Sequence, residues 1–201
     1  MLMRILTEFD RFPEEKDLVG SLVVGYGEIE FSLMSCVGLV CMDGDMNRAA
    51  RVLFRVPGEA ARINVADALL KPALMTVKLD GQWSNAVGAL RHCKTIRNQY
   101  AHCHWTAFEG LEFANLDEAA GSSEGVAMVK IRRIDLTLLR QQMGYFEYAV
   151  TWLYHLYGEY EKRTGKLPTQ YVDAPKVVDP PPLYNPPASV APTSTEAGPA
   201  S

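Results

Sequence analysis

The chain has 201 residues, a formal net charge of −4 and 48% hydrophobic residues. This length fits one domain of ordinary size with an additional segment, and the apolar content excludes a globally disordered chain. The acidic balance argues against a protein that coats nucleic acid through its overall charge, whereas a local basic patch is compatible with it. The four cysteines lie in or beside segments of helical pattern, so we expect reduced thiols rather than a disulfide framework.

No secretory signal is visible at the start of the sequence, where acidic residues stand in place of an apolar segment. The apolar run 33–42 is broken by polar and small residues and is too short to cross a bilayer. We therefore expect a cytoplasmic protein that does not enter the membrane.

Apolar residues recur at spacings of three and four along most of the chain, which predicts a mainly α-helical bundle of four to five long helices. The expected helices cover residues 13–43, 45–56, 59–77, 83–101 and 136–157. Pro72 is expected to kink or split the third of them, because proline lacks an N–H donor and clashes with the preceding turn. The last helix has an unbroken apolar seam, suited to packing against neighbouring helices or a second copy of itself.

Two runs between the last two helices, 105–113 and 125–134, alternate between apolar and polar residues. They predict an antiparallel β-hairpin with a loose acidic loop at 115–124. From residue 166 the composition changes, since nine of the twelve prolines fall within 166–201. We expect a helical domain over residues 10–165 and a disordered, proline-rich tail over 166–201, removable with little loss of stability.

The stretch 96–105 reads I-R-N-Q-Y-A-H-C-H-W and concentrates polar chemistry at the end of the fourth predicted helix. Arg97 falls within the apolar stripe of this helix, where a cation is costly unless an anion or a set of acceptors meets it. His102 lies on another face, about 140° away in an ideal helix. Either the helix distorts near its end, or the two side chains meet partners from another chain.

Long helices, the motif R-N-x-x-A-H near the end of the fourth, and a closing helix together resemble the HEPN superfamily (higher eukaryote and prokaryote nucleotide-binding) over about residues 10–162. The resemblance implies a metal-independent endoribonuclease of toxin or defence type. Its homodimer would join the motifs of two protomers in one cleft, with Arg97, Asn98 and His102 in the catalytic positions. It also implies RNA as substrate, no cofactor, and a neutralising or regulatory protein partner. The predicted hairpin is an addition to the minimal bundle, and His104 stands where some toxin members carry a modified tyrosine.

The residue types suit cleavage of RNA without a metal. A histidine titrates near neutrality and can move the proton of a 2′-hydroxyl, while an arginine offers a planar, permanently charged fork for phosphate oxygens. Asn98 can orient the histidine ring or donate to the phosphate. The polar and aromatic residues that we expect to bind substrate around them are Arg91, Lys94, Tyr100, His104 and Glu30.

Three other interpretations fit the same stretch. Arg97 and His102 can simply stabilise the end of a helix, where cations are favourable. The chain can be a catalytically inactive HEPN-like module that binds a nucleotide, RNA or protein. The third interpretation is a zinc site with donors from His92, Cys93, His102, Cys103 and His104. These residues lack the two-residue gaps between ligands that are typical of structural zinc sites.

Overall fold

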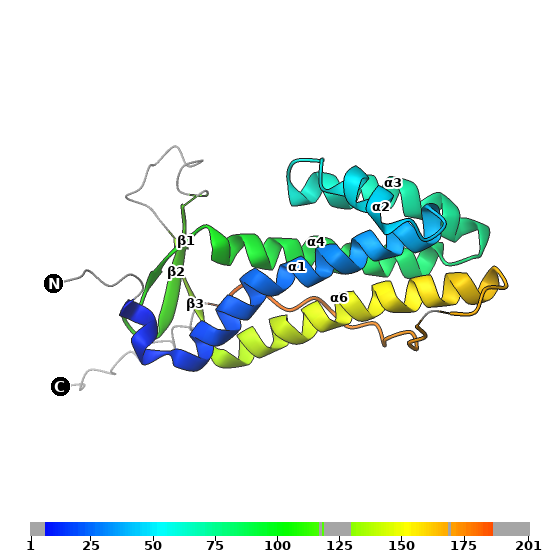
Figure 1. Cartoon of the computed structure of the whole chain (residues 1–201). Helices are drawn as coiled ribbons and strands as arrows, with labels where there is room; N and C mark the ends of the chain where they lie inside the picture. Colours follow the sequence, from blue (N-terminus) through cyan, green and yellow to red (C-terminus); the bar gives the residue numbers. More distant parts are fainter. Residues whose placement is uncertain (1–6, 117, 119–129, 169, 187–201) are drawn as a thin grey trace, which may run out of the picture.

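Long helices lie side by side, and a small antiparallel sheet covers one end of them (Figure 1). The computed structural model describes residues 7–116, 118, 130–168 and 170–186. A short 3-10 helix, η1, precedes the bundle and covers Thr7–Arg11. The α-helices are α1 (Pro13–Cys41), α2 (Met46–Leu53), α3 (Glu59–Thr76), α4 (Asp80–Ala101) and α6 (Leu136–Arg163). The strands are β1 (Cys103–Thr106), β2 (Leu111–Asn115) and β3 (Ile131–Ile134).

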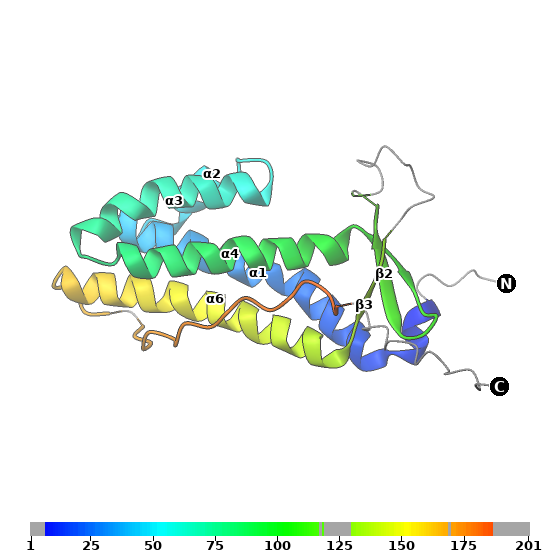
Figure 2. The same ribbon diagram turned by 180° about the vertical axis from the view of Figure 1, so that it is seen from behind.

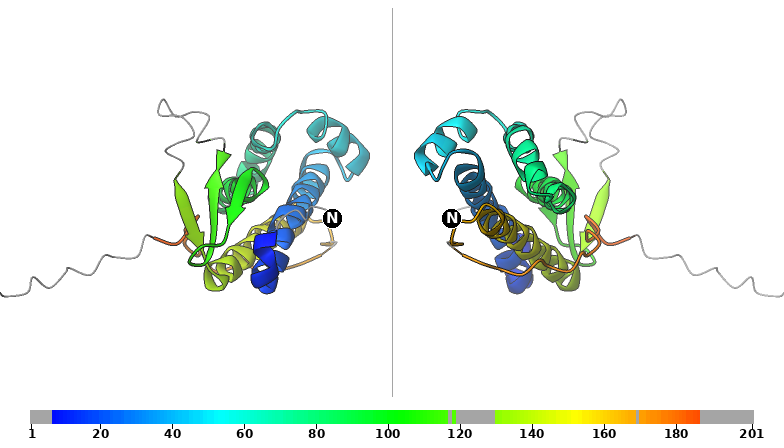
Figure 3. Two further views of the ribbon diagram at one scale, coloured as in Figure 1. Left: turned by 90° about the vertical axis from the view of Figure 1, so that its left-hand side faces the viewer. Right: turned by 90° about the vertical axis from the view of Figure 1, so that its right-hand side faces the viewer.

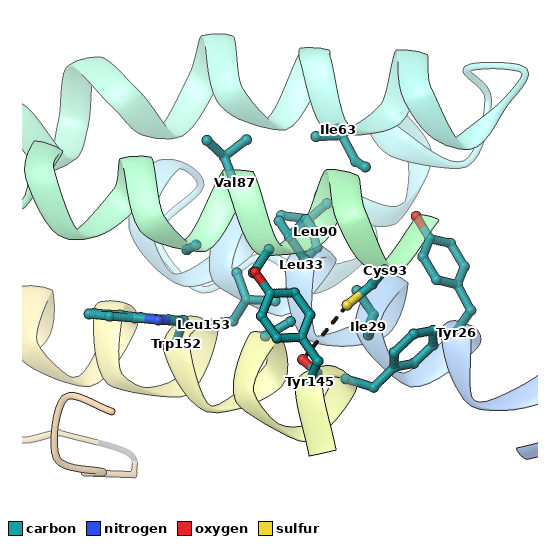
Figure 4. Packing of buried hydrophobic residues seen from close by; sticks show 14 of the residues in the cluster. Tyr26, Ile29, Leu33, Ile63, Val87, Leu90, Cys93, Tyr145, Trp152 and Leu153 are labelled. Atoms are coloured by element: carbon teal, nitrogen blue, oxygen red, sulfur yellow. Dashed lines mark hydrogen bonds between the residues drawn. The ribbon is translucent and has the colours of Figure 1, made fainter. Parts of the chain in front are cut away.

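The core lies between α1, α4 and α6, which contact one another along the bundle (Figures 1 and 4). Leu22 and Ile29 of α1, Leu90 of α4, and Phe146 and Leu153 of α6 are buried there. The apolar seam predicted on the last helix is therefore used inside the protomer. Because this seam is buried, α6 presents no continuous apolar stripe to a second copy, and the interface of a homodimer would use other surfaces.

The α2–α3 pair lies on the side of the bundle away from α6, as the end-on views show (Figure 3). The Asp45 side chain accepts from the Arg48 N–H at 2.9 Å and so caps α2, as expected for an aspartate at a helix start. Pro72 lies within α3, and its side chain is exposed. The predicted split at Pro72 is wrong, because α3 continues on both sides of it.

The sheet has three strands in the order β1-β2-β3, all antiparallel. The run 105–113, predicted to be one strand, instead contains the end of β1, a turn over 107–110 and the start of β2. Trp105 pairs with Phe113, so odd-numbered residues of β1 face odd-numbered residues of β2. The alternation of apolar and polar residues therefore keeps the same odd and even positions on both sides of the turn. For this reason the sequence resembles a single strand. The second predicted strand is confirmed at Ile131–Ile134, whereas residues 125–129 lie outside the described residues.

A cluster of aromatic rings fixes the sheet to the end of α4. The Trp105 ring lies 5.7 Å from Tyr100, 5.6 Å from Phe113 and 4.9 Å from Phe9, measured between ring centroids. All four side chains are buried. Because Tyr100 belongs to α4, this cluster holds the last turn of that helix, and the motif on it, in one position.

Among the described residues, α1 is the one helix long and apolar enough to cross a membrane, with a mean hydropathy of 1.4 over its best window. Half of that window is buried against the rest of the chain. The core helix of a soluble protein has the same properties, and the packing of α1 on α4 and α6 is compatible with a soluble protein.

Residues 170–186, here the C-terminal segment, run back along α6 beside α4 toward the sheet (Figure 2). Polar side chains of α4 and α6 donate to its carbonyl oxygens: His92 to Pro181 (2.8 Å), Gln99 to Leu183 (2.7 Å), Gln142 to Pro182 (2.8 Å) and His155 to Val172 (2.8 Å). The expectation of a disordered tail is wrong for this segment. Extended proline-rich chain leaves its carbonyls free, and these glutamines and histidines bind them. Residues 187–201 lie outside the described residues.

Ending the chain at Lys166 is therefore expected to lower the free energy of unfolding by about 3 kcal/mol, since several bonds of about 1 kcal/mol each are lost. The melting temperature should fall by roughly 6–12 °C for a chain of this size. The matched control ends the chain at Pro186 and keeps every contact described above. Equal melting temperatures for the two truncated chains, measured by differential scanning calorimetry, would show that the segment adds nothing to stability.

Candidate functional site

The motif occupies the last turn of α4 and the residue that follows it. Ile96 and Tyr100 of this turn are buried, and their packing fixes the orientation of the residues between them. His102 ends the helix, and its N–H donates to Asn98 O at 3.2 Å. The carbonyl of His102 accepts from Leu116 N–H at 3.4 Å. The His102 backbone is thus held between α4 and the sheet, while its imidazole is exposed and forms no hydrogen bond or ion pair with the described residues.

Arg97 is directed toward the start of α3. Its Nη1 lies 3.3 Å from Glu59 Oε1 and donates to Asn98 Oδ1 at 3.0 Å. The arginine side chain is 27% exposed, and its Nε is buried without an acceptor among the described residues. The expectation that an anion meets this cation is confirmed, and the anion comes from the same chain. Because Nε is buried, it cannot reach a ligand, whereas Nη2 forms no hydrogen bond with the described residues and is the group of the guanidinium left for one.

A second ion pair, Glu30 with Arg62, lies beside the first one, between α1 and α3. Tyr26 is buried next to both pairs, and burial together with the nearby Glu30 and Glu59 carboxylates raises its pKa above the ordinary value. Its hydroxyl therefore stays protonated. Glu30, expected to bind substrate, is instead committed to Arg62. Figure 4 shows Tyr26 among the core residues near Cys93.

Two other expected substrate-binding residues are also used inside the fold. Tyr100 is 4% exposed and donates to Gln142 Oε1 at 2.6 Å, and burial raises its pKa. Its hydroxyl therefore does not reach a substrate, and this prediction is wrong. Arg91 is half exposed and contacts Asn64 and Asp67 of α3 at 3.4 Å each. It lies away from His102 on α4, toward α3.

The structure brings Asn98 and Lys94 together in a surface pocket of about 290 Å³, here the Asn98 pocket. Its wall also includes Arg132 of β3 and Tyr184 of the C-terminal segment. His104 lies separately, exposed on the edge strand β1 opposite Ala114. None of the described hydrogen bonds or ion pairs joins Arg97 to His102, whereas Asn98 accepts from Arg97.

Sequence reasoning missed Glu59, Arg132 and Tyr184. Glu59 follows Pro57-Gly58 at a helix start, where an acid is expected for the helix dipole alone. Tyr184 lies in a segment expected to be disordered. Arg132 lies in a strand with a second arginine beside it, and nothing in the alternation shows which of the two faces the motif.

The zinc interpretation finds no support in the described chain. No group of three or more His, Cys, Asp or Glu side chains there is placed to hold a metal ion. His92 binds Pro181 O, and the Cys93 thiol donates to Tyr145 O at 3.7 Å (Figure 4). Burial raises the pKa of the Cys103 thiol to about 12, so that thiol stays protonated at neutral pH.

Comparisons with protein-family models, with curated proteins and with solved structures find no match for this chain. The fold defines a mainly helical protein with a small antiparallel sheet at one end of its bundle. The candidate site consists of an exposed histidine at a helix end, with a partly exposed arginine and an asparagine in the preceding turn.

Proposed function

We propose that this chain is a metal-independent endoribonuclease of the HEPN type, in which Arg97, Asn98 and His102 carry out the reaction at a homodimer cleft. The observation that carries the proposal is the state of His102. Its backbone is bonded on both sides, yet its imidazole is exposed and without a partner in the described chain. A histidine that only stabilised the helix end would be expected to bind the last carbonyls with its side chain.

The chemistry follows from the residue types. The imidazole of His102 accepts the proton of a ribose 2′-hydroxyl, and the 2′-oxygen then attacks the adjacent phosphorus. The bond from phosphorus to the 5′-oxygen breaks, and that oxygen takes the proton held by the His102 imidazolium and leaves as a hydroxyl. Arg97 offers the Nη2 N–H groups of its guanidinium, which form no hydrogen bond with the described residues, to the charge that builds up on the phosphate oxygens. The products are a 2′,3′-cyclic phosphate and a 5′-hydroxyl end.

A second copy of the chain completes this site. Arg97 pairs with Glu59 of α3, and His102 is the residue that follows α4. Residues five positions apart point about 140° apart in an ideal helix, which favours a site that joins the two side chains from different protomers. A two-fold axis near the end of α4 would place the arginine of one protomer beside the histidine of its partner. We propose that the dimer acts in the cytoplasm as a toxin-like or defence ribonuclease under the control of a protein partner.

Purified protein is expected to cleave single-stranded RNA in the presence of EDTA and to leave 2′,3′-cyclic phosphate ends, which mass spectrometry identifies. Neither proton transfer nor phosphate neutralisation in this reaction requires a metal. A His102→Ala preparation purified in parallel controls for contaminating ribonuclease. Cleavage that disappears on chelation, or products ending in 3′-hydroxyl groups, would contradict the mechanism.

One observation favours a second function, a catalytically inactive module that binds a nucleotide, RNA or protein. The Glu59 carboxylate pairs with Arg97 and partly neutralises the charge that phosphate stabilisation needs. If the pair stays closed in the dimer, the chain binds RNA without cutting it. RNA binding by the wild-type protein, with no cleavage of any RNA offered, would support this function over the first.

A further inference from the structure

The Asn98 pocket lies on the face of α4 that leads to His102. Lys94, Asn98 and His102 follow one another at intervals of four, so they form one stripe on the helix, each about 6 Å further along its axis. Lys94 lies about 12 Å from His102 along that axis. A nucleotide held in the pocket is therefore a neighbour of the one whose phosphate meets His102.

Two polar groups in the pocket are unused by the fold. The Lys94 ammonium forms no hydrogen bond or ion pair with any described residue, although its side chain is only partly exposed. The Asn98 side chain accepts from Arg97 through Oδ1, while its amide nitrogen donates to no described group. A cation and an amide donor, one helical turn apart, can bind a phosphate and the edge of a base.

The opposite wall carries an aromatic ring held in place. Tyr184 is 37% exposed, and the Arg132 guanidinium lies 4.6 Å from its ring centroid. Arg132 is in turn fixed by Glu118, with Nη2 to Oε2 at 2.6 Å. The bond from Gln99 to Leu183 O, at 2.7 Å, holds the backbone next to Tyr184 against α4. The ring is thus positioned before any ligand arrives.

Tyr184 and Arg132 also line a second pocket, of about 810 Å³, together with other residues of β2 and β3. The Tyr184 and Arg132 side chains therefore lie between the two pockets. An aromatic ring and a guanidinium plane in this position can stack on an unpaired base, because every base has a π-face.

We propose that the Asn98 pocket binds one nucleotide of single-stranded RNA next to the cleaved position, with its base on Tyr184 and its phosphate at Lys94. This inference rests on the proposed ribonuclease function and assigns the C-terminal segment a part in substrate binding. A protein ligand is a weaker fit, since the pocket combines a cation, an amide donor and a positioned ring in the space of one nucleotide.

The test measures binding of fluorescein-labelled hexaadenylate by anisotropy, in a His102→Ala background so that no cleavage occurs. Tyr184→Ala should raise Kd by about tenfold, and the dependence of binding on salt should not change, because stacking carries no charge. Lys94→Ala should raise Kd and reduce the slope of log K against log salt by about 0.7, the value for one contact with single-stranded nucleic acid. Tyr184→Trp should retain binding.

Two control variants separate these roles from structural effects. Tyr171→Ala removes an exposed tyrosine at the far end of the C-terminal segment and should leave Kd unchanged. Asn185→Ala removes the bond from Asn185 Nδ2 to Asp135 Oδ2, at 2.9 Å, and loosens the segment while keeping the Tyr184 ring. A loss of affinity in Asn185→Ala equal to that in Tyr184→Ala would overturn the stacking role.

The failure of this inference can be told from the failure of the proposed function. If Tyr184→Ala and Lys94→Ala bind as tightly as the parent protein while wild-type protein cleaves RNA, the nucleotide site is wrong and the ribonuclease stands. If both variants bind weakly but wild-type protein never cleaves, the nucleotide site stands without catalysis. Absence of any hexaadenylate binding by the parent protein overturns the site.

Discussion

Replacing His102 by alanine is expected to lower the single-turnover rate of RNA cleavage by about 10²–10⁴-fold, the usual contribution of a general acid or base. Because the imidazole is exposed and forms no hydrogen bond or ion pair with the described residues, its removal should leave the melting temperature unchanged. A loss of rate without a loss of stability separates a catalytic role from a structural one. Unchanged cleavage by His102→Ala would reject the assignment of this residue.

Arg97→Ala is expected to cost about 10²–10³-fold through lost stabilisation of the phosphate charge. This variant also leaves Glu59 without its partner, so its melting temperature has to be measured alongside its rate. Arg97→Lys keeps the charge that faces Glu59 but loses the planar fork, and should restore stability more fully than activity. Asn98→Ala should cost less than either. Arg140→Ala, which removes an exposed arginine paired with Glu14, is the matched control.

Much of the helical architecture could be predicted from the sequence because its elements follow local rules. The 3.6-residue periodicity, the proline at the start of α1 and the aspartate caps of α2 and α6 each depend on residues close in the chain. The sheet was predicted with one strand too few. The turn at 107–110 keeps the alternation in phase, and no local pattern distinguishes it from continuous strand.

The C-terminal segment could not be predicted because its contacts leave no periodic pattern. Pro181 and Leu183 are bound through backbone carbonyls, which every residue has. The signal lies in the partners instead, since Gln99 and Gln142 are polar residues on buried helix faces. A buried glutamine requires a hydrogen-bond partner, and that requirement was readable from the sequence even though the partner was not.

The candidate site was predictable in its residues but not in its connections. An arginine in an apolar stripe predicted an anion, which the structure supplies as Glu59. Tyr100 and Glu30, both predicted to bind substrate, are bonded to Gln142 and Arg62 within the fold, because aromatic and acidic residues near a motif serve the core equally well. Choosing between the two roles requires knowing which helices face each other, and that is a property of the whole fold.

The composite site proposed for Arg97 and His102 leads to the second large effect, recovery of activity when two inactive variants are mixed. If each site combines the arginine of one protomer with the histidine of its partner, a heterodimer of Arg97→Ala and His102→Ala has one intact site and one doubly altered site. After complete subunit exchange half of the dimers are heterodimers, so the mixture should recover about a quarter of the wild-type activity.

The alternative arrangement predicts a different result for the same mixture. If Arg97 and His102 of one chain act together, neither site of the heterodimer is intact, and mixing restores nothing. The control for subunit exchange mixes wild-type protein with a double variant that carries both substitutions. Under the composite arrangement, heterodimers of these two chains have no intact site. The activity of the mixture should therefore fall below the value expected from dilution alone. Light scattering decides whether the comparison applies, since a mass near 22.3 kDa, that of one chain, would exclude the dimer and the composite site together.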